Sequence, residues 1–281
     1  HPKEFVTHGT IVGSDAVDRI NRLYSWVDNF GWEAHERCGI HVHADVRQLS
    51  VAQLHNIMVI YALCEPVLFH HVGEAREKST YCIPWYRSDT QAIALGNTVR
   101  VRDGAACLER HFANFCKYSA LNLSAVRKFG SIEFRMAPTF GTGDELVHWV
   151  SMLTNIVASH SSYDSPQEVV EAFMRMGARQ FYSGIFGRSF RYVRDYRDSD
   201  LWERLADETD CVGVAERVGV EAQYKATSWA ANTAELRLED VEPLRRRPTI
   251  RRQSINIDGF TRLTGYLDLS TAEFDHEQEI E

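Results

Sequence analysis

The residue types best suited to chemistry lie in two short segments about ninety residues apart. The first carries His41 and His43, the second carries Glu133 and Arg135, and each pair encloses one apolar residue. Successive side chains of a strand point to opposite faces of a sheet, so each pair should share a face. If the two strands are neighbours, all four side chains meet in one cleft. Imidazoles with a carboxylate suit a divalent cation, and a guanidinium suits a phosphate or a carboxylate.

Either pair alone also has an ordinary structural explanation. A His-x-His pair is often a pair of satisfied hydrogen-bonding groups, and a Glu-x-Arg pair is often a cross-strand contact at the surface. Apolar neighbours surround both pairs, with Ile40 and Val42 around the first and Ile132 and Phe134 around the second. These surroundings favour a functional, partly buried site over two unrelated surface pairs.

A longer series of motifs accompanies these pairs. In order, the chain contains Lys3-Glu-Phe-Val-Thr7, Cys38-Gly-Ile-His-Val-His-Ala-Asp45, Lys117-Tyr-Ser-Ala-Leu-Asn122, Gly130-Ser-Ile-Glu-Phe-Arg135 and Gly141-Thr-Gly-Asp-Glu-Leu-Val-His-Trp-Val150. This series resembles the amidoligase family of bacteria and phages, which belongs to the glutamine synthetase and glutamate–cysteine ligase superfamily. The resemblance covers residues 3–160, with His8 in place of an expected proline.

The resemblance implies an ATP-dependent carboxylate–amine ligase that works through an acyl phosphate and uses Mg²⁺ or Mn²⁺. Its substrates would be a carboxylate and an amine, each a small molecule or a peptide. By this resemblance Glu4, His41 and Glu133 would be metal ligands. His43 would contact a nucleotide phosphate, and Arg135 would stabilise the transferred phosphoryl group.

The same resemblance implies further contacts to nucleotide or substrate. Lys117, Tyr118 and Asn122 would help to hold these ligands. Arg76 is a candidate anion contact because an arginine followed by a Tyr-Cys pair, here residues 81 and 82, also resembles the family. A solvated surface arginine is the alternative explanation for Arg76.

One family feature is missing and keeps two other interpretations open. The family opens with a Glu-x-Glu strand that supplies metal carboxylates, whereas this sequence starts with His1, close to the next motif. We therefore expect residue 1 not to be the start of the translated product. Without those carboxylates the alternative is a catalytically inactive ligase fold, acting as a structural or interaction component of a phage particle or larger assembly. A zinc hydrolase is the third interpretation, but Val46 replaces the last histidine of its His-x-His-x-Asp-His pattern.

The sequence predicts an α+β fold in which a mostly antiparallel sheet carries the site and helices cover its other face. Strands are expected around residues 4–12, 38–46 and 131–136. Amphipathic helices are expected to begin at Ser14, Ser50, Asp144 and Ser165, each of which is a good N-cap residue. We expect a catalytic core over 1–160, a helical extension over 161–240, and a linker with an acidic tail over 241–281.

The composition of the chain indicates which partners and which cellular compartment are expected. A net charge of −8 argues against a dedicated nucleic-acid binder. No apolar run approaches the ~20 residues of a membrane helix, so we expect no membrane partner. The six cysteines form no Cys-x-x-Cys pair and are typical of reduced thiols, which favours the cytoplasm, or a virion if the gene belongs to a phage. The C-terminal region is the candidate surface for self-association or for an assembly partner.

Overall fold

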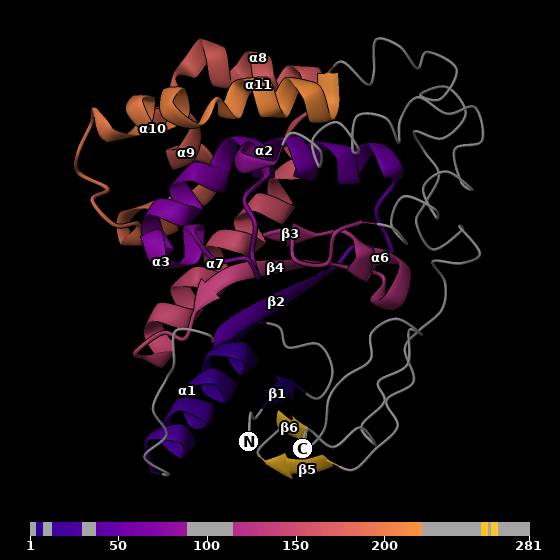
Figure 1. Ribbon diagram of the computed structural model, residues 1–281, viewed down its shortest axis with the longest axis vertical. Helices are drawn as coiled ribbons and strands as arrows, with labels where there is room; N and C mark the ends of the chain where they lie inside the picture. Colours follow the sequence, from indigo (N-terminus) through magenta and orange to yellow (C-terminus); the bar gives the residue numbers. More distant parts are fainter. Residues whose placement is uncertain are drawn as a thin grey trace.

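An antiparallel sheet of three strands forms the centre of the protein, in the order β2-β4-β3 (Figure 1). The computed structural model describes residues 4–7, 13–29, 38–88, 115–220, 254–257 and 260–263. The strands are β2 Gly39–Asp45, β4 Ser131–Pro138 and β3 Leu121–Asn122. One face of the sheet is apolar, since Ile132, Phe134 and Met136 of β4 are fully buried. The polar residues between them therefore point to the opposite face, which we call the polar face.

Helix α2, Val51–Val72, covers the apolar face of this sheet and is the centre of the core. It begins at Ser50 as predicted, with a capping box that Gln53 completes, and it runs on through Pro66. Tyr61 packs against Phe134 of β4, with ring centroids 6.0 Å apart. Among the described residues α2 is the one helix long and apolar enough to cross a membrane, and 89% of its apolar window is buried inside the protein. The sequence analysis was therefore wrong that no apolar run approaches this length, and the burial of α2 in the core accounts for its apolar composition.

Two amphipathic helices, α1 and α7, pack against each other beside the main sheet. Helix α1, Gly13–Asn29, packs along helix α7, Gly143–Ala158, and the Tyr24 hydroxyl donates to the Phe140 carbonyl at 3.1 Å. The cap of α7 differs from the prediction. Thr142, not Asp144, is the N-cap, because its backbone is extended and its hydroxyl accepts from the Glu145 N–H. Asp144 lies inside the first turn, where its charge complements the helix dipole.

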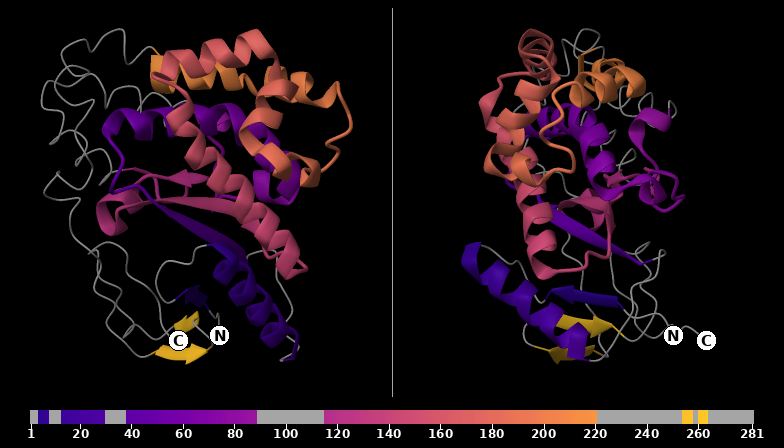
Figure 2. Two further views of the ribbon diagram at one scale, coloured as in Figure 1. Left: turned by 180° about the vertical axis from the view of Figure 1, so that it is seen from behind. Right: turned by 90° about the vertical axis from the view of Figure 1, so that its left-hand side faces the viewer.

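The described part of the C-terminal region, up to residue 220, is helical and packs around α2 (Figure 2). Its main helices are α8 Pro166–Met176, which begins at Ser165 as predicted, α9 Ala178–Phe186, α10 Leu201–Thr209 and α11 Cys211–Ala215. Short helices connect the larger elements: α3 Glu74–Glu77, η1 Trp85–Arg87, α6 Ser124–Phe129, η2 Ser159–Ser162, η3 Gly187–Tyr192 and η4 Glu216–Val220. The aromatic side chains of Phe181, Tyr182 and Trp202 are fully buried there. The α+β prediction is confirmed.

A second, smaller sheet lies on the side of the main sheet opposite to α2 (Figures 1 and 2). Its strands are β1 Glu4–Thr7, β5 Ser254–Ile257 and β6 Phe260–Leu263, in the antiparallel order β1-β6-β5. The two C-terminal strands fall within residues 241–281, for which the sequence suggested only a linker and a tail. The pairing of β1 with β6 thus joins an N-terminal strand to a C-terminal one on the side of the polar face.

Candidate active site

A buried carboxylate, Glu133, is the centre of a polar cluster on the polar face of the main sheet. Its side chain is 3% exposed, and its Oε1 lies 2.9 Å from Nδ1 of His41 and 2.6 Å from Nη1 of Arg135. Nε2 of His43 lies 3.8 Å from the same oxygen. Asn122 Nδ2 donates to Oε2 at 2.6 Å. Three strands thus bring together five side chains that the sequence analysis singled out.

Strand register explains this convergence. His43 of β2 and Asn122 of β3 both pair with Glu133 of β4, so these three residues form one row across the sheet. A β-bulge between Ile40 and Val42 interrupts the pairing around His41. Two residues of β4, Arg135 and Met136, lie opposite the single residue His41 there. Across this irregular pairing the His41 imidazole still contacts Glu133, at 2.9 Å.

Ser131 is a member of the cluster that the sequence analysis missed. Its hydroxyl lies 2.9 Å from Nδ1 of His43, which leaves Nε2 directed at the centre of the cluster. The ring of Phe129 packs against the same imidazole at a centroid distance of 5.6 Å. The alternation of Ser131, Glu133 and Arg135 on one strand face was the available signal, because all three share the polar face.

Charge in the cluster is balanced between Glu133 and Arg135. Burial favours a raised pKa for the Glu133 carboxyl, but the hydrogen bond from His41 and the electrostatic effect of the neighbouring His43 and Arg135 side chains outweigh it and hold the pKa well below its usual range. Desolvation lowers the pKa of His43, with Glu133 opposing the shift. The His43 side chain keeps 41% exposure, so solvent limits this shift. At neutral pH the cluster therefore holds a carboxylate, a guanidinium and a neutral His43.

The described residues do not complete a magnesium site. Mg²⁺ demands several oxygen ligands, but the cluster contains a single carboxylate, whose two oxygens already accept from Arg135 and Asn122. A guanidinium 2.6 Å from Oε1 would also repel a dication placed there. In the described part of the chain no group of three or more His, Cys, Asp or Glu side chains could hold a metal ion. Asp45, which the zinc-hydrolase pattern would use, pairs instead with Arg47.

The remaining sequence-predicted residues lie around the cluster. Glu4 is in β1, in the second sheet, and its side chain lies outside the described part of the structure. Lys117 and Tyr118 are exposed, and the Lys117 ammonium lies 5.1 Å from the Tyr118 ring centroid. They precede β3, the strand that carries Asn122.

Arg76 is buried and binds the sheet backbone. Its guanidinium donates to the carbonyls of Met136 and Arg135 at 3.0 and 2.9 Å, and to Cys38 at 3.5 Å. A Cβ atom on residue 39 would lie only 3.0 Å from Nη2 of Arg76. Glycine at the start of β2 therefore leaves room for this guanidinium. Arg76 thus joins the ends of β2 and β4, and its predicted role as an anion contact stays a prediction.

Replacing Ser131 with alanine should weaken the orientation of His43 without disturbing the fold. One hydrogen bond contributes ~0.5–1.5 kcal/mol, so a reaction that depends on His43 should slow by up to about 10-fold. The measurement is kcat for S131A, with the melting temperature as the check on folding. A rate unchanged within error would show that the Ser131 contact does not orient a functional imidazole.

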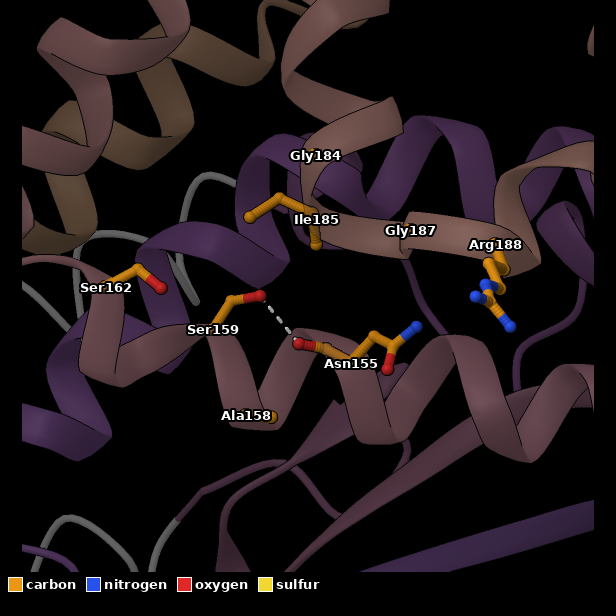
Figure 3. Close-up of a pocket in the computed structure, with 8 residues that line it drawn as sticks. All are labelled: Asn155, Ala158, Ser159, Ser162, Gly184, Ile185, Gly187 and Arg188. Carbon is orange, nitrogen blue, oxygen red and sulfur yellow. Dashed lines mark hydrogen bonds between the residues drawn. The ribbon is translucent and has the colours of Figure 1, made fainter.

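A separate open pocket of about 490 Å³ lies between the end of α7 and the α9–η3 region (Figure 3). It shares no residue with the Glu133 cluster. The Ser159 hydroxyl and the Asn155 amide already donate to the carbonyls of Asn155 and Phe186, which leaves Arg188 as a charged group in its lining. This pocket offers no set of groups for catalysis.

Comparison with known proteins gives one match. A family model described as "putative amidoligase enzyme" matches residues 11–156, which is just over half of the chain and includes β2, β3 and β4. No curated protein and no solved structure matches the chain.

Proposed function

The chain belongs to the family of putative amidoligase enzymes, and from that premise we propose that it joins a carboxylate to an amine at the expense of ATP. The observation that carries the proposal is the Glu133 cluster. It holds a charged guanidinium and a neutral imidazole together on the polar face of the sheet, within the segment that the family model covers.

The chemistry of amide formation requires such groups. A carboxylate and an amine do not condense in water, so the carboxylate oxygen first attacks the γ-phosphorus of ATP and ADP leaves. The amine nitrogen then attacks the acyl carbon of the resulting acyl phosphate, phosphate departs, and the nitrogen loses a proton. Both steps develop negative charge on phosphate oxygens, which a preorganised cation stabilises.

Each residue of the cluster has a role in this scheme. Arg135 binds the transferred phosphoryl group, and Glu133 holds the guanidinium in place at 2.6 Å. In the first step His43, with its proton on Nε2, donates to a phosphate oxygen. In the second step the other neutral tautomer, with the proton on Nδ1 towards Ser131, accepts at Nε2 the proton that the amine loses. Asn122 fixes the second oxygen of Glu133. Because the described residues do not complete a site for Mg²⁺ or Mn²⁺, we assign no step to a metal ion.

The experiment that tests the proposal is calorimetric titration of the protein with MgATP, followed by a screen for ADP release with panels of carboxylates and amines. His41→Ala is the test variant, because it removes a hydrogen bond to Glu133. Arg19→Ala is the matched control, because Arg19 forms an exposed pair with Asp15 on α1, outside the cluster.

The expected result is MgATP binding that H41A weakens at least 10-fold and R19A leaves unchanged, together with ADP release that needs both a carboxylate and an amine. Failure of wild-type protein to bind MgATP would contradict the proposal. It would favour the inactive ligase fold, whose Glu133, Arg135 and Asn122 contacts serve structure alone.

A further inference from the structure

Two exposed tyrosines form an aromatic surface beside the Glu133 cluster. Tyr81 and Tyr118 are 53% and 38% exposed, and their rings meet edge to face with centroids 5.8 Å apart. The Lys117 ammonium lies over the Tyr118 ring. Exposed apolar patches that polar residues border are typical of ligand-binding grooves and other interaction sites. Tyr81 is a residue to which the sequence analysis gave no role.

Hydrogen bonds connect the two chain segments that carry these tyrosines. Ile83 N–H donates to the Tyr118 carbonyl at 2.7 Å, and Ala120 N–H donates to the Ile83 carbonyl at 2.9 Å. Below them the indole N–H of the buried Trp85 donates to Ser119 Oγ at 2.7 Å. The segments that carry Tyr81 and Tyr118 are therefore bonded to one another. A ligand ring would meet a preorganised surface and would not have to order it.

Backbone contacts also join this surface to the charged cluster. The Arg135 Nε–H donates to the Tyr81 carbonyl at 3.4 Å, and the Arg135 N–H donates to the Ala120 carbonyl at 2.8 Å. Arg135 thus lies between Glu133 and the tyrosine pair.

We infer that Tyr81 and Tyr118 bind the base of a nucleotide, with its phosphates directed towards Arg135 and His43. This inference rests on the proposed function, because it names the part of the site that would hold the ring of ATP. Because the two ring planes stand at 79°, the more exposed Tyr81 supplies the flat π-surface on which a base stacks, and Tyr118 contacts the edge of that base. Lys117 and Arg135 supply positive charge to the attached phosphates. The aromatic surface and the positive charges match the two ends of such a ligand. Tyr81 is then a specificity-determining residue of the site.

The test compares ADP with inorganic tripolyphosphate, a polyanion that carries at least the charge of the ADP phosphates and lacks the base. Both are titrated with magnesium into wild-type protein, Tyr81→Ala and Tyr81→Phe by calorimetry. Substitution leaves the backbone carbonyl of residue 81 in place, so the contact to Arg135 is kept. Tyr192→Ala is the control for removing an exposed aromatic ring elsewhere, since Tyr192 stacks on His148 in the C-terminal region.

Removing one stacked ring should weaken ADP binding about 10-fold in Y81A. Tripolyphosphate should bind Y81A as it binds wild type, and Y81F and Y192A should bind both ligands as wild type does. Equal ADP affinity in wild type and Y81A would overturn the ring site and leave the proposed function standing. Absence of ADP and tripolyphosphate binding to wild type would overturn both the nucleotide site and the ATP dependence of the proposed function.

Discussion

Glu133→Gln is expected to reduce the rate of ADP release by about 100- to 1000-fold, the range typical for loss of one preorganised charged group in an active site. The carboxylate accepts hydrogen bonds at both oxygens, from Arg135 and His41 at Oε1 and from Asn122 at Oε2. A glutamine has only one acceptor oxygen. Whichever way its amide is turned, an N–H₂ group faces a donor, so either Arg135 or Asn122 loses its partner.

The same substitution should lower the stability of the protein. Arg135 is 11% exposed, and leaving such a guanidinium without its carboxylate costs about 3–5 kcal/mol. Chemical denaturation of E133Q measures this loss. The double variant E133Q/R135M removes both charges and should recover part of the stability, while ADP release stays lost because the phosphoryl contact is gone.

These two measurements separate catalysis from folding. A double variant that is folded, stable and inactive would show that the charges serve the reaction. Full activity in folded E133Q protein would contradict the role of Glu133 in holding Arg135, and the family membership would then carry no information about this cluster.

The convergence of His43, Glu133 and Arg135 could be predicted from the sequence because strand alternation is a local rule. The bulge opposite His41 could not be predicted, since nothing in residues 40–42 sets the register against β4. The two-residue strand β3 is also too short to show a pattern, and it took the Lys-Tyr…Asn motif to draw attention to Asn122. The local pattern therefore predicts the two main strands, β2 and β4, whereas the pairing between strands determines the geometry of the cluster.

Long-range pairing explains most of the other differences. Strands β5 and β6 consist of four residues each and pair with each other, and β1, some 250 residues earlier in the chain, completes their sheet by pairing with β6. Arg76 looked like a surface residue or an anion contact because its three backbone acceptors come from β4 and from Cys38. Such contacts leave no periodic signal in the sequence.

A buried carboxylate in the core, Glu65, is expected to make the stability of the protein depend on pH. It is fully buried in the middle of α2. Its oxygens accept from the Tyr61 hydroxyl at 2.5 Å and from the backbone N–H groups of Trp85 and Tyr86 at 2.8 and 3.2 Å. Glu65 thereby fixes the start of η1, the turn that follows Tyr81. Burial raises the pKa of the Glu65 carboxyl to about 7, although the three hydrogen bonds oppose the shift.

A raised pKa makes Glu65 a source of instability as the pH rises. Below the unfolded-state value of 4.5 the carboxyl is protonated in both states and carries no penalty. Between 4.5 and about 7 the unfolded chain ionises first, so unfolding becomes easier, and above about 7 the penalty is constant. A shift of this size corresponds to about 3 kcal/mol. Glu133, whose pKa is lowered, has the opposite sign, and its contribution is already complete above 4.5.

Glu65→Gln isolates this effect, because glutamine keeps the shape of the protonated acid and never ionises. We expect E65Q and wild type to have similar unfolding free energies at pH 4.5, and E65Q to be more stable by about 3 kcal/mol at pH 8. Tyr61→Phe is the matched variant: it removes a hydrogen bond that holds the pKa of Glu65 down, so it should steepen the loss of stability with rising pH. Urea denaturation across this pH range measures all three proteins. A stability difference between E65Q and wild type that stays the same from pH 4.5 to pH 8 would show that Glu65 is ionised in the folded protein throughout, and that its three hydrogen bonds outweigh its burial.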